Sequence, residues 1–128
     1  MKYLVTIESF NELVEEEIIV NIDGQELRCF MPYGMENGIN IGDKCSVDIE
    51  VEFYDDIELE IIQEDIKKIE CIGETFSHYI YGKVDIDKCV IKSSIEIKLD
   101  EDDLIEHGYC DNQYVRLKVD RFNIEFIS

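Results

Sequence analysis

The stretch GDKCSVDIEVEFYDDIELEIIQ, residues 42–63, decides the fold that the sequence predicts. From Cys45 to Phe53 apolar residues occupy every second position, and polar or acidic residues stand between them. This two-residue period is typical of a β-strand with one buried and one exposed face. The alternation stops at residues 54–56 and resumes over residues 57–61. We therefore predict a β-hairpin with a three-residue loop, because that loop pairs apolar with apolar residues across the two strands.

The predicted hairpin carries an acidic face. Its register places Glu52 opposite Glu58 and Glu50 opposite Glu60, and like charges in such positions destabilise a sheet. A protein can tolerate that cost where the face binds a partner, so this face is the candidate partner-binding site. Tyr54, at the hairpin tip, is the candidate aromatic anchor. The candidate residues are Asp48, Glu50, Glu52, Tyr54, Asp55, Asp56, Glu58 and Glu60.

The dipeptide Asp23-Gly24 is the strongest turn signal in the chain. Asp-Gly suits the positive φ angles of a type I′ hairpin turn. With these two residues as the loop, Val20 pairs with Leu27, and the flanking residues on that face pair in the same register. The sequence thus predicts a tight hairpin here.

Two further hairpins are predicted toward the carboxyl end of the chain. Residues 78–86 and 89–99 alternate, and a two-residue loop between them places Ile80 opposite Ile95. The last alternating segment is predicted to turn near Asp120 and form a final hairpin.

A short helix is predicted over residues 101–107. Asp100 can cap its amino end, where further acids interact favourably with the helix dipole. Gly108 is placed to end it.

The composition favours strands over helices. The chain has no Ala or Trp and more Ile than Leu, and Ile favours strands whereas Ala is the best helix former. A length of 128 residues suits one domain. We predict a single acidic all-β domain, residues 1–128, of about eight strands and one short helix. The mostly antiparallel hairpins form a partly open β-barrel, with a two-layer β-sandwich as the second choice.

The charge is strongly negative and unevenly distributed. The formal net charge is -19; residues 1–64 hold 17 acids and three bases, and residues 65–128 hold 14 acids and nine bases. Such a field repels nucleic acids and anionic membranes and attracts basic partners. The alternative interpretation is that the acidity only keeps the protein soluble.

The cysteines and the amino end indicate an intracellular protein. The five cysteines are an odd number, lie far apart and form no CxxC pair, so neither a disulfide framework nor a zinc site is predicted. The start MKYLVTIESF lacks the long apolar region of a signal peptide, and no apolar run is long enough to span a membrane. We expect a cytoplasmic protein.

No motif for catalysis or for a cofactor is present. The sequence lacks HExxH, GxSxG, Walker A and GxGxxG patterns. The run DEDDLIEH lacks the glycine and the final glutamate of an EF-hand loop. His78 and His107 have no metal-ligand spacing, and a structural or exposed role is expected for both. The sequence therefore predicts no enzyme, no metal and no cofactor.

Three hypotheses follow for the function. In the first, the protein binds and neutralises a basic partner, as a bacterial immunity or antitoxin-type inhibitor of a toxin or nuclease; such inhibitors share this size, this acidity and the lack of catalytic motifs. In the second, a small β-barrel module binds a ligand with the loop 31–42, through Met31, Tyr33 and Met35. The third is an enzyme, which would require a cleft joining a histidine to a cysteine and an acid.

Overall fold

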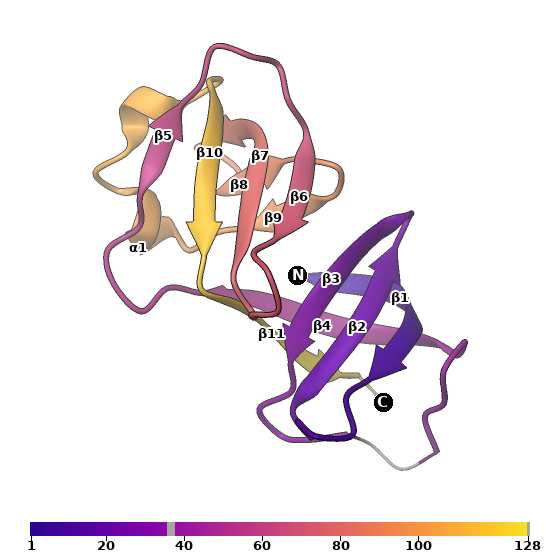
Figure 1. Ribbon diagram of the computed structural model, residues 1–128. Helices are drawn as coiled ribbons and strands as arrows, with labels where there is room; N and C mark the ends of the chain where they lie inside the picture. The colour runs from indigo at the N-terminus through magenta and orange to yellow at the C-terminus, as the bar shows by residue number, and fades with distance from the viewer. Residues whose placement is uncertain (36–37, 128) are drawn as a thin grey trace.

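The computed structural model describes residues 1–35 and 38–127 and contains two β-sheets (Figure 1). The first is a closed barrel made of β1 (Lys2–Phe10), β2 (Glu17–Ile22), β3 (Gln25–Phe30), β4 (Lys44–Glu52) and β11 (Arg121–Phe126). The second contains β5 (Leu59–Ile61), β6 (Lys68–Cys71), β7 (His78–Asp85), β8 (Val90–Lys92), β9 (Glu96–Lys98) and β10 (Tyr114–Val119). Between β9 and β10 lie the helix α1 (Glu101–Leu104) and the 3₁₀ turn η1 (Gly108–Cys110).

The barrel has the strand order β1-β2-β3-β11-β4, and β4 closes it against β1. Strand β11 runs parallel to β3 and antiparallel to β4, whereas the other neighbouring pairs are antiparallel. The second sheet is inserted between the fourth and fifth barrel strands, β4 and β11. The all-β class and the barrel are thus confirmed, but the barrel closes with five strands and is not partly open.

The second sheet has the order β5-β10-β7-β8-β9, and β6 also pairs with β7. Along one edge of β7 the partner changes at Gly82, from β6 beside His78–Tyr81 to β8 beside Lys83–Asp85. A Cβ added to Gly82 would lie 2.5 Å from the backbone oxygen of Lys92. Gly82 therefore allows a close backbone approach at the point where the sheet bends.

Several local predictions are confirmed. Asp23 and Gly24 form the predicted turn, both with positive φ, and β2 pairs with β3 in the predicted register. Asp100 caps α1 by accepting a hydrogen bond from the backbone of Asp102, although α1 ends at Leu104, before the predicted carboxyl end.

The hairpin predicted over residues 78–99 is only partly present. Val84 lies opposite Ile91 as expected. Beyond Lys92 the chain turns back into β9, so Ile95 does not face Ile80, which pairs instead with Ile69 and Leu117. The prediction was wrong there because a second local turn competes with extension of the ladder.

Two predicted hairpins are wrong. Strand β4 pairs with β1 and β11, and β5 pairs with β10. The two strands predicted within residues 42–63 are therefore not hydrogen-bonded to each other. Likewise β10 and β11 lie in different sheets. The chain leaves the barrel after β4 and returns to it with β11 (Figure 1). Alternation defines which face of a strand is buried, but not which strand lies beside it.

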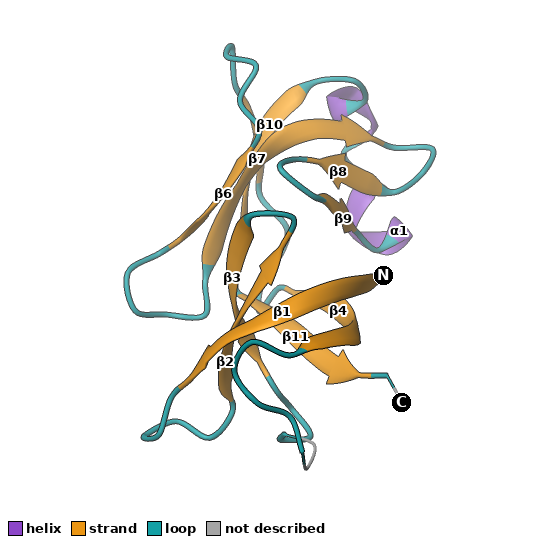
Figure 2. Ribbon diagram, turned by 90° about the vertical axis from the view of Figure 1, so that its right-hand side faces the viewer, coloured by secondary structure: helices purple, strands orange, loops and turns teal. Residues whose placement is uncertain are grey.

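The two sheets share one hydrophobic core. Buried residues from both form a single cluster that includes Leu27, Phe122, Ile80 and Leu117. Figure 2 shows the second sheet above the barrel. At the junction the Gln25 side chain donates to the Ile69 carbonyl oxygen (3.0 Å), which joins β3 to β6. Within the described residues, no helix is long and apolar enough to cross a membrane.

Candidate interaction surface

Glu52 is partly exposed at the end of β4 and does not lie opposite Glu58. It lies opposite Arg121 on β11 and forms an ion pair with that guanidinium. The Asn123 amide donates a second hydrogen bond to Glu52 (2.9 Å). The hydrogen bond from Asn123, together with the Arg121 cation, lowers the pKa of Glu52. The predicted repulsion between Glu52 and Glu58 is therefore replaced by a long-range attraction.

Two other candidate acids are also neutralised. Glu60 lies opposite Arg116 on β10, and their side chains form an ion pair at 2.7 Å. Asp48 accepts from the Met1 ammonium group at 2.8 Å. The expectation that Glu50 lies opposite Glu60 is wrong, because Glu50 lies opposite Asn123 on the neighbouring strand β11.

The remaining candidate residues are exposed. Tyr54 is 64% exposed, and its backbone N–H donates to Asp120 (2.7 Å). Asp55, Asp56 and Glu58 are exposed and form no ion pair with any other described residue. These residues lie in the segment that carries the chain from the barrel to the second sheet.

A groove lies between this segment and α1. It has a volume of 400 Å³ and is lined by Asp55, Asp56, Ile57, Asp102, Asp103, Ile105, Glu106 and His107. We call it the acidic groove. Its five carboxylates come from two segments about fifty residues apart in the sequence, and no lysine or arginine lines it. Ile105 contributes apolar surface and is 78% exposed.

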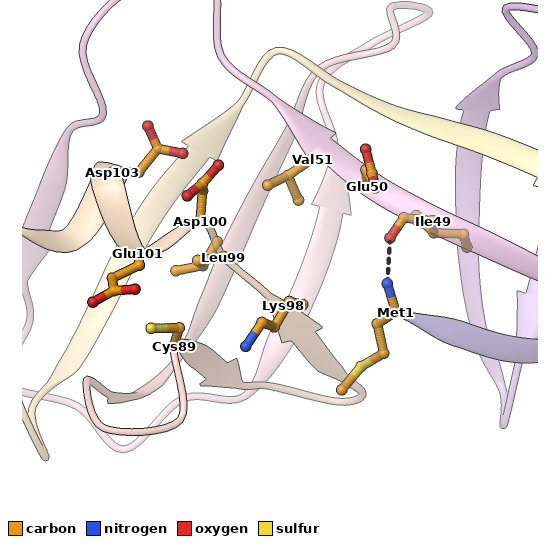
Figure 3. Close-up of a pocket in the computed structure, with 10 residues that line it drawn as sticks. All are labelled: Met1, Ile49, Glu50, Val51, Cys89, Lys98, Leu99, Asp100, Glu101 and Asp103. Carbon is orange, nitrogen blue, oxygen red and sulfur yellow. Dashed lines mark hydrogen bonds between the residues drawn. The ribbon is translucent and has the colours of Figure 1, made fainter.

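A second depression adjoins the acidic groove at Asp103 (Figure 3). It lies between the barrel and the second sheet, has a volume of 440 Å³, and is lined by Met1, Ile49, Glu50, Val51, Cys89, Lys98, Leu99, Asp100, Glu101 and Asp103. We call it the inter-sheet cleft. Burial and the neighbouring charges of Asp100 and Asp102 raise the pKa of Asp103. The carboxylates around α1 therefore repel one another.

The two histidines lie in different environments. His78 is fully buried, with Nε2 accepting from the backbone of Arg28. His107 lines the acidic groove, where Nδ1 lies 3.3 Å from the Tyr109 hydroxyl. The groove contains a histidine and acids but no cysteine, and the inter-sheet cleft contains Cys89 and acids but no histidine. Among the described residues no group of three or more side chains is arranged to hold a metal ion.

The loop 31–42 divides into a buried and an exposed part. Met31 belongs to the core, whereas Tyr33 and Met35 are exposed. These two residues line a depression of 270 Å³ together with Ile124 and Phe126. Residues 36 and 37 of the predicted loop lie outside the described residues.

The structure thus divides the predicted face. It brings Asp55 and Asp56 together with acids of α1, places Glu50 in the adjoining cleft, and neutralises Asp48, Glu52 and Glu60 elsewhere. Sequence reasoning missed the contribution of α1. Its acidic run was visible, but only the tertiary fold places it beside residues 55–56.

Fold and surface together define an all-β barrel protein with an acidic groove between α1 and the segment that leads from the barrel to the inserted sheet. The chain belongs to a family described as "Uncharacterised conserved protein UCP019853", whose model matches residues 1–127. No curated protein and no solved structure matches the chain.

Proposed function

We propose that this protein is a non-catalytic interaction protein that binds and neutralises a basic protein, as a bacterial immunity or antitoxin-type inhibitor does for a toxin or nuclease. The observation that carries the proposal is the acidic groove, where five carboxylates face no lysine or arginine. In this role the protein acts in the cytoplasm, beside its target.

The charge distribution favours a basic protein over a nucleic acid. The net charge of -19 repels the phosphate groups of nucleic acids. Carboxylates that repel one another in the free protein gain attraction when lysine or arginine side chains enter between them. Charges at the rim chiefly raise the association rate and make it sensitive to salt.

Apolar residues beside the carboxylates can supply affinity. Ile105 lines the acidic groove, and Tyr54 precedes the Asp55-Asp56 pair that also lines it. Exposed aliphatic and aromatic groups surrounded by charges are typical of the anchors at protein interfaces. This surface fits a partner whose binding face has apolar residues at its centre and basic residues around them.

The proposal is tested by matched neutralisation. In the groove variant, Asp55, Asp56 and Asp102 become Asn and Glu106 becomes Gln. In the control variant, Glu8, Glu12, Glu15 and Glu16, all exposed on β1 and the loop that follows it, become Gln. Both variants have the same net charge, so a difference between them reports the location of the charge.

Each protein is immobilised, exposed to a cell lysate at physiological salt, and the retained proteins are identified and assayed for enzymatic activity. We expect a basic protein that binds wild type and control, escapes the groove variant and loses activity when bound. Equal retention by the groove variant and the control would contradict the proposal.

A second candidate function is ligand binding by the loop 31–42. The exposed Tyr33 and Met35 beside the 270 Å³ depression favour it. Amide shifts confined to residues 33–35 and 124–126 during a small-molecule screen would support this function, and shifts confined to the acidic groove would reject it.

A further inference from the structure

We propose that the free edge of β5 is the docking site for a basic strand of the partner, which extends the second sheet by antiparallel or parallel pairing. This inference rests on the proposed function and specifies how the partner binds. The class of partner is a protein segment in which basic and apolar residues alternate.

The backbone of β5 is paired on one side only. Strand β10 is its neighbour, with Arg116 opposite Glu60, and the backbone N–H of Ile62 donates to Tyr114 (2.9 Å). Because ladder bonds alternate along an antiparallel pair, Glu60 also points its N–H and C=O toward β10. The N–H and C=O of Leu59 and Ile61 therefore point away, and no described residue bonds them.

The side chains at this edge leave apolar surface uncovered. Ile61 is 41% exposed, although Val115, its partner across the ladder, is fully buried. The hydrophobic core therefore reaches β5 and stops without a covering element. An incoming strand would cover Ile61 and bond both outward residues, as in β-strand addition to a sheet edge.

The charges around the edge select the partner. Residues 55–65 contain Asp55, Asp56, Glu58, Glu60, Glu64 and Asp65 and no lysine or arginine. Charged side chains on an edge strand discourage pairing with a second copy, because like charges then meet. Glu60 is paired with Arg116, whereas Glu58 forms no ion pair with a described residue and attracts a strand with lysine or arginine on the same face.

The acidic groove is continuous with this edge. Asp55, Asp56 and Ile57 line the groove and lead directly into β5. Figure 1 shows β5 at the side of the second sheet, with β10 as its neighbouring strand. If the partner's basic strand continues past the amino end of β5, it would therefore enter the acidic groove between residues 55–57 and α1.

The test uses defined peptides as probes. The first alternates lysine and valine. The second has the same sequence, but every backbone nitrogen is methylated, so that it keeps its charge and cannot donate a ladder hydrogen bond through either of its edges. Affinity is measured by fluorescence anisotropy, and the amides of Leu59 and Ile61 are followed by NMR.

A matched pair of variants tests the same point from the protein side. Ile61→Pro removes an outward N–H and keeps the bonds to β10, because proline is tolerated on an edge strand. Ile61→Val keeps the N–H. Thermal melts check that both variants fold. The methylated peptide is measured on the wild type, so this comparison remains valid even if Ile61→Pro does not fold.

We expect the unmodified peptide to bind wild type and Ile61→Val about tenfold more tightly than it binds Ile61→Pro, and about tenfold more tightly than the methylated peptide binds wild type. The amides of Leu59 and Ile61 should become protected from exchange on binding.

The contrary results separate the two proposals. If both peptides bind equally and only the groove variant loses them, the edge is not the docking site, but the acidic surface still binds a basic partner. If neither peptide binds, both proposals fail for this class of ligand. If the free protein dimerises with the Leu59 and Ile61 amides protected, a second copy occupies the edge and the inference is overturned.

Discussion

His78 in β7 accepts a hydrogen bond from the backbone N–H of Arg28 in β3, with 3.2 Å between the two nitrogens. Its Nδ1 lies 2.9 Å from the carbonyl oxygen of Phe76, so a neutral ring with the proton on Nδ1 satisfies both contacts. The ring also packs edge-on against Phe122 of β11, at 4.8 Å between centroids. His78 therefore joins the second sheet to the barrel.

We expect this junction to weaken in mild acid. Burial, with a smaller contribution from the Arg28 cation, lowers the pKa of His78 to about 4. An unfolded histidine has a pKa of about 6.5, so between these values the unfolded state binds more protons. The free energy of unfolding should therefore fall by roughly 3 kcal/mol as the pH drops through this window.

Urea unfolding at several pH values measures this effect. Since carboxylates also titrate in acid, the comparison is with His78→Gln, whose amide oxygen can accept the Arg28 hydrogen bond without taking up a proton. The wild type should lose more stability than the variant between these pH values. Parallel curves for the two proteins would show that His78 does not titrate in this way.

Arg121 is expected to be the most costly surface cation to remove. Its guanidinium lies 3.9 Å from the centroid of Phe30 and pairs with Glu52. Arg121→Ala should lower the free energy of unfolding by about 1–2 kcal/mol. Arg116→Ala removes a more exposed pair and should cost less than Arg121→Ala. Chemical denaturation checks the ranking, and a larger loss for Arg116→Ala would refute it.

Gly82→Ala is expected to destabilise the second sheet. Its Cβ would lie 2.5 Å from the Lys92 oxygen, so β7 and the turn after β8 must separate. Overpacking of this kind typically costs about 1–3 kcal/mol. Gly108→Ala is the control, because no atom lies within 4 Å of its added Cβ. Thermal melts should show a lower Tm for Gly82→Ala alone; equal melting temperatures would mean that the close approach is absent.

Asp103→Asn should make the protein more stable and bind a basic partner less well. The raised pKa of Asp103 means that its charged form is disfavoured in the folded state, by burial and by Asp100 and Asp102. Removing the charge relieves this cost. A higher Tm with weaker retention of basic protein is the expected result. A lower Tm would show that Asp103 stabilises the fold.

Local signals in the sequence predicted some elements well. The Asp23-Gly24 turn set the register of β2 and β3, and Asp100 marked the start of α1. Both depend on residues close together in the chain, where turn and cap chemistry is readable. The alternation of β4 likewise marked Val47 and Ile49 as buried.

Long-range pairing could not be read in the same way. Glu52 pairs with a residue 69 positions later. The alternation of residues 45–53 is equally compatible with the predicted partner, Glu58. For the same reason the site was only half predicted. Asp55 and Asp56 were identified as candidates, whereas the acids of α1 became part of the site only through the insertion of the second sheet.

The most direct test of the acidic groove is zero-length carbodiimide cross-linking of the protein to a retained basic partner, followed by peptide mass spectrometry. This reagent joins a carboxylate to a lysine only where the two are in contact. We predict that the cross-links concentrate on Asp55, Asp56, Asp102 and Glu106. Cross-links concentrated on Glu8, Glu12, Glu15 and Glu16, or spread evenly over the exposed acids, would contradict the groove as the site of binding.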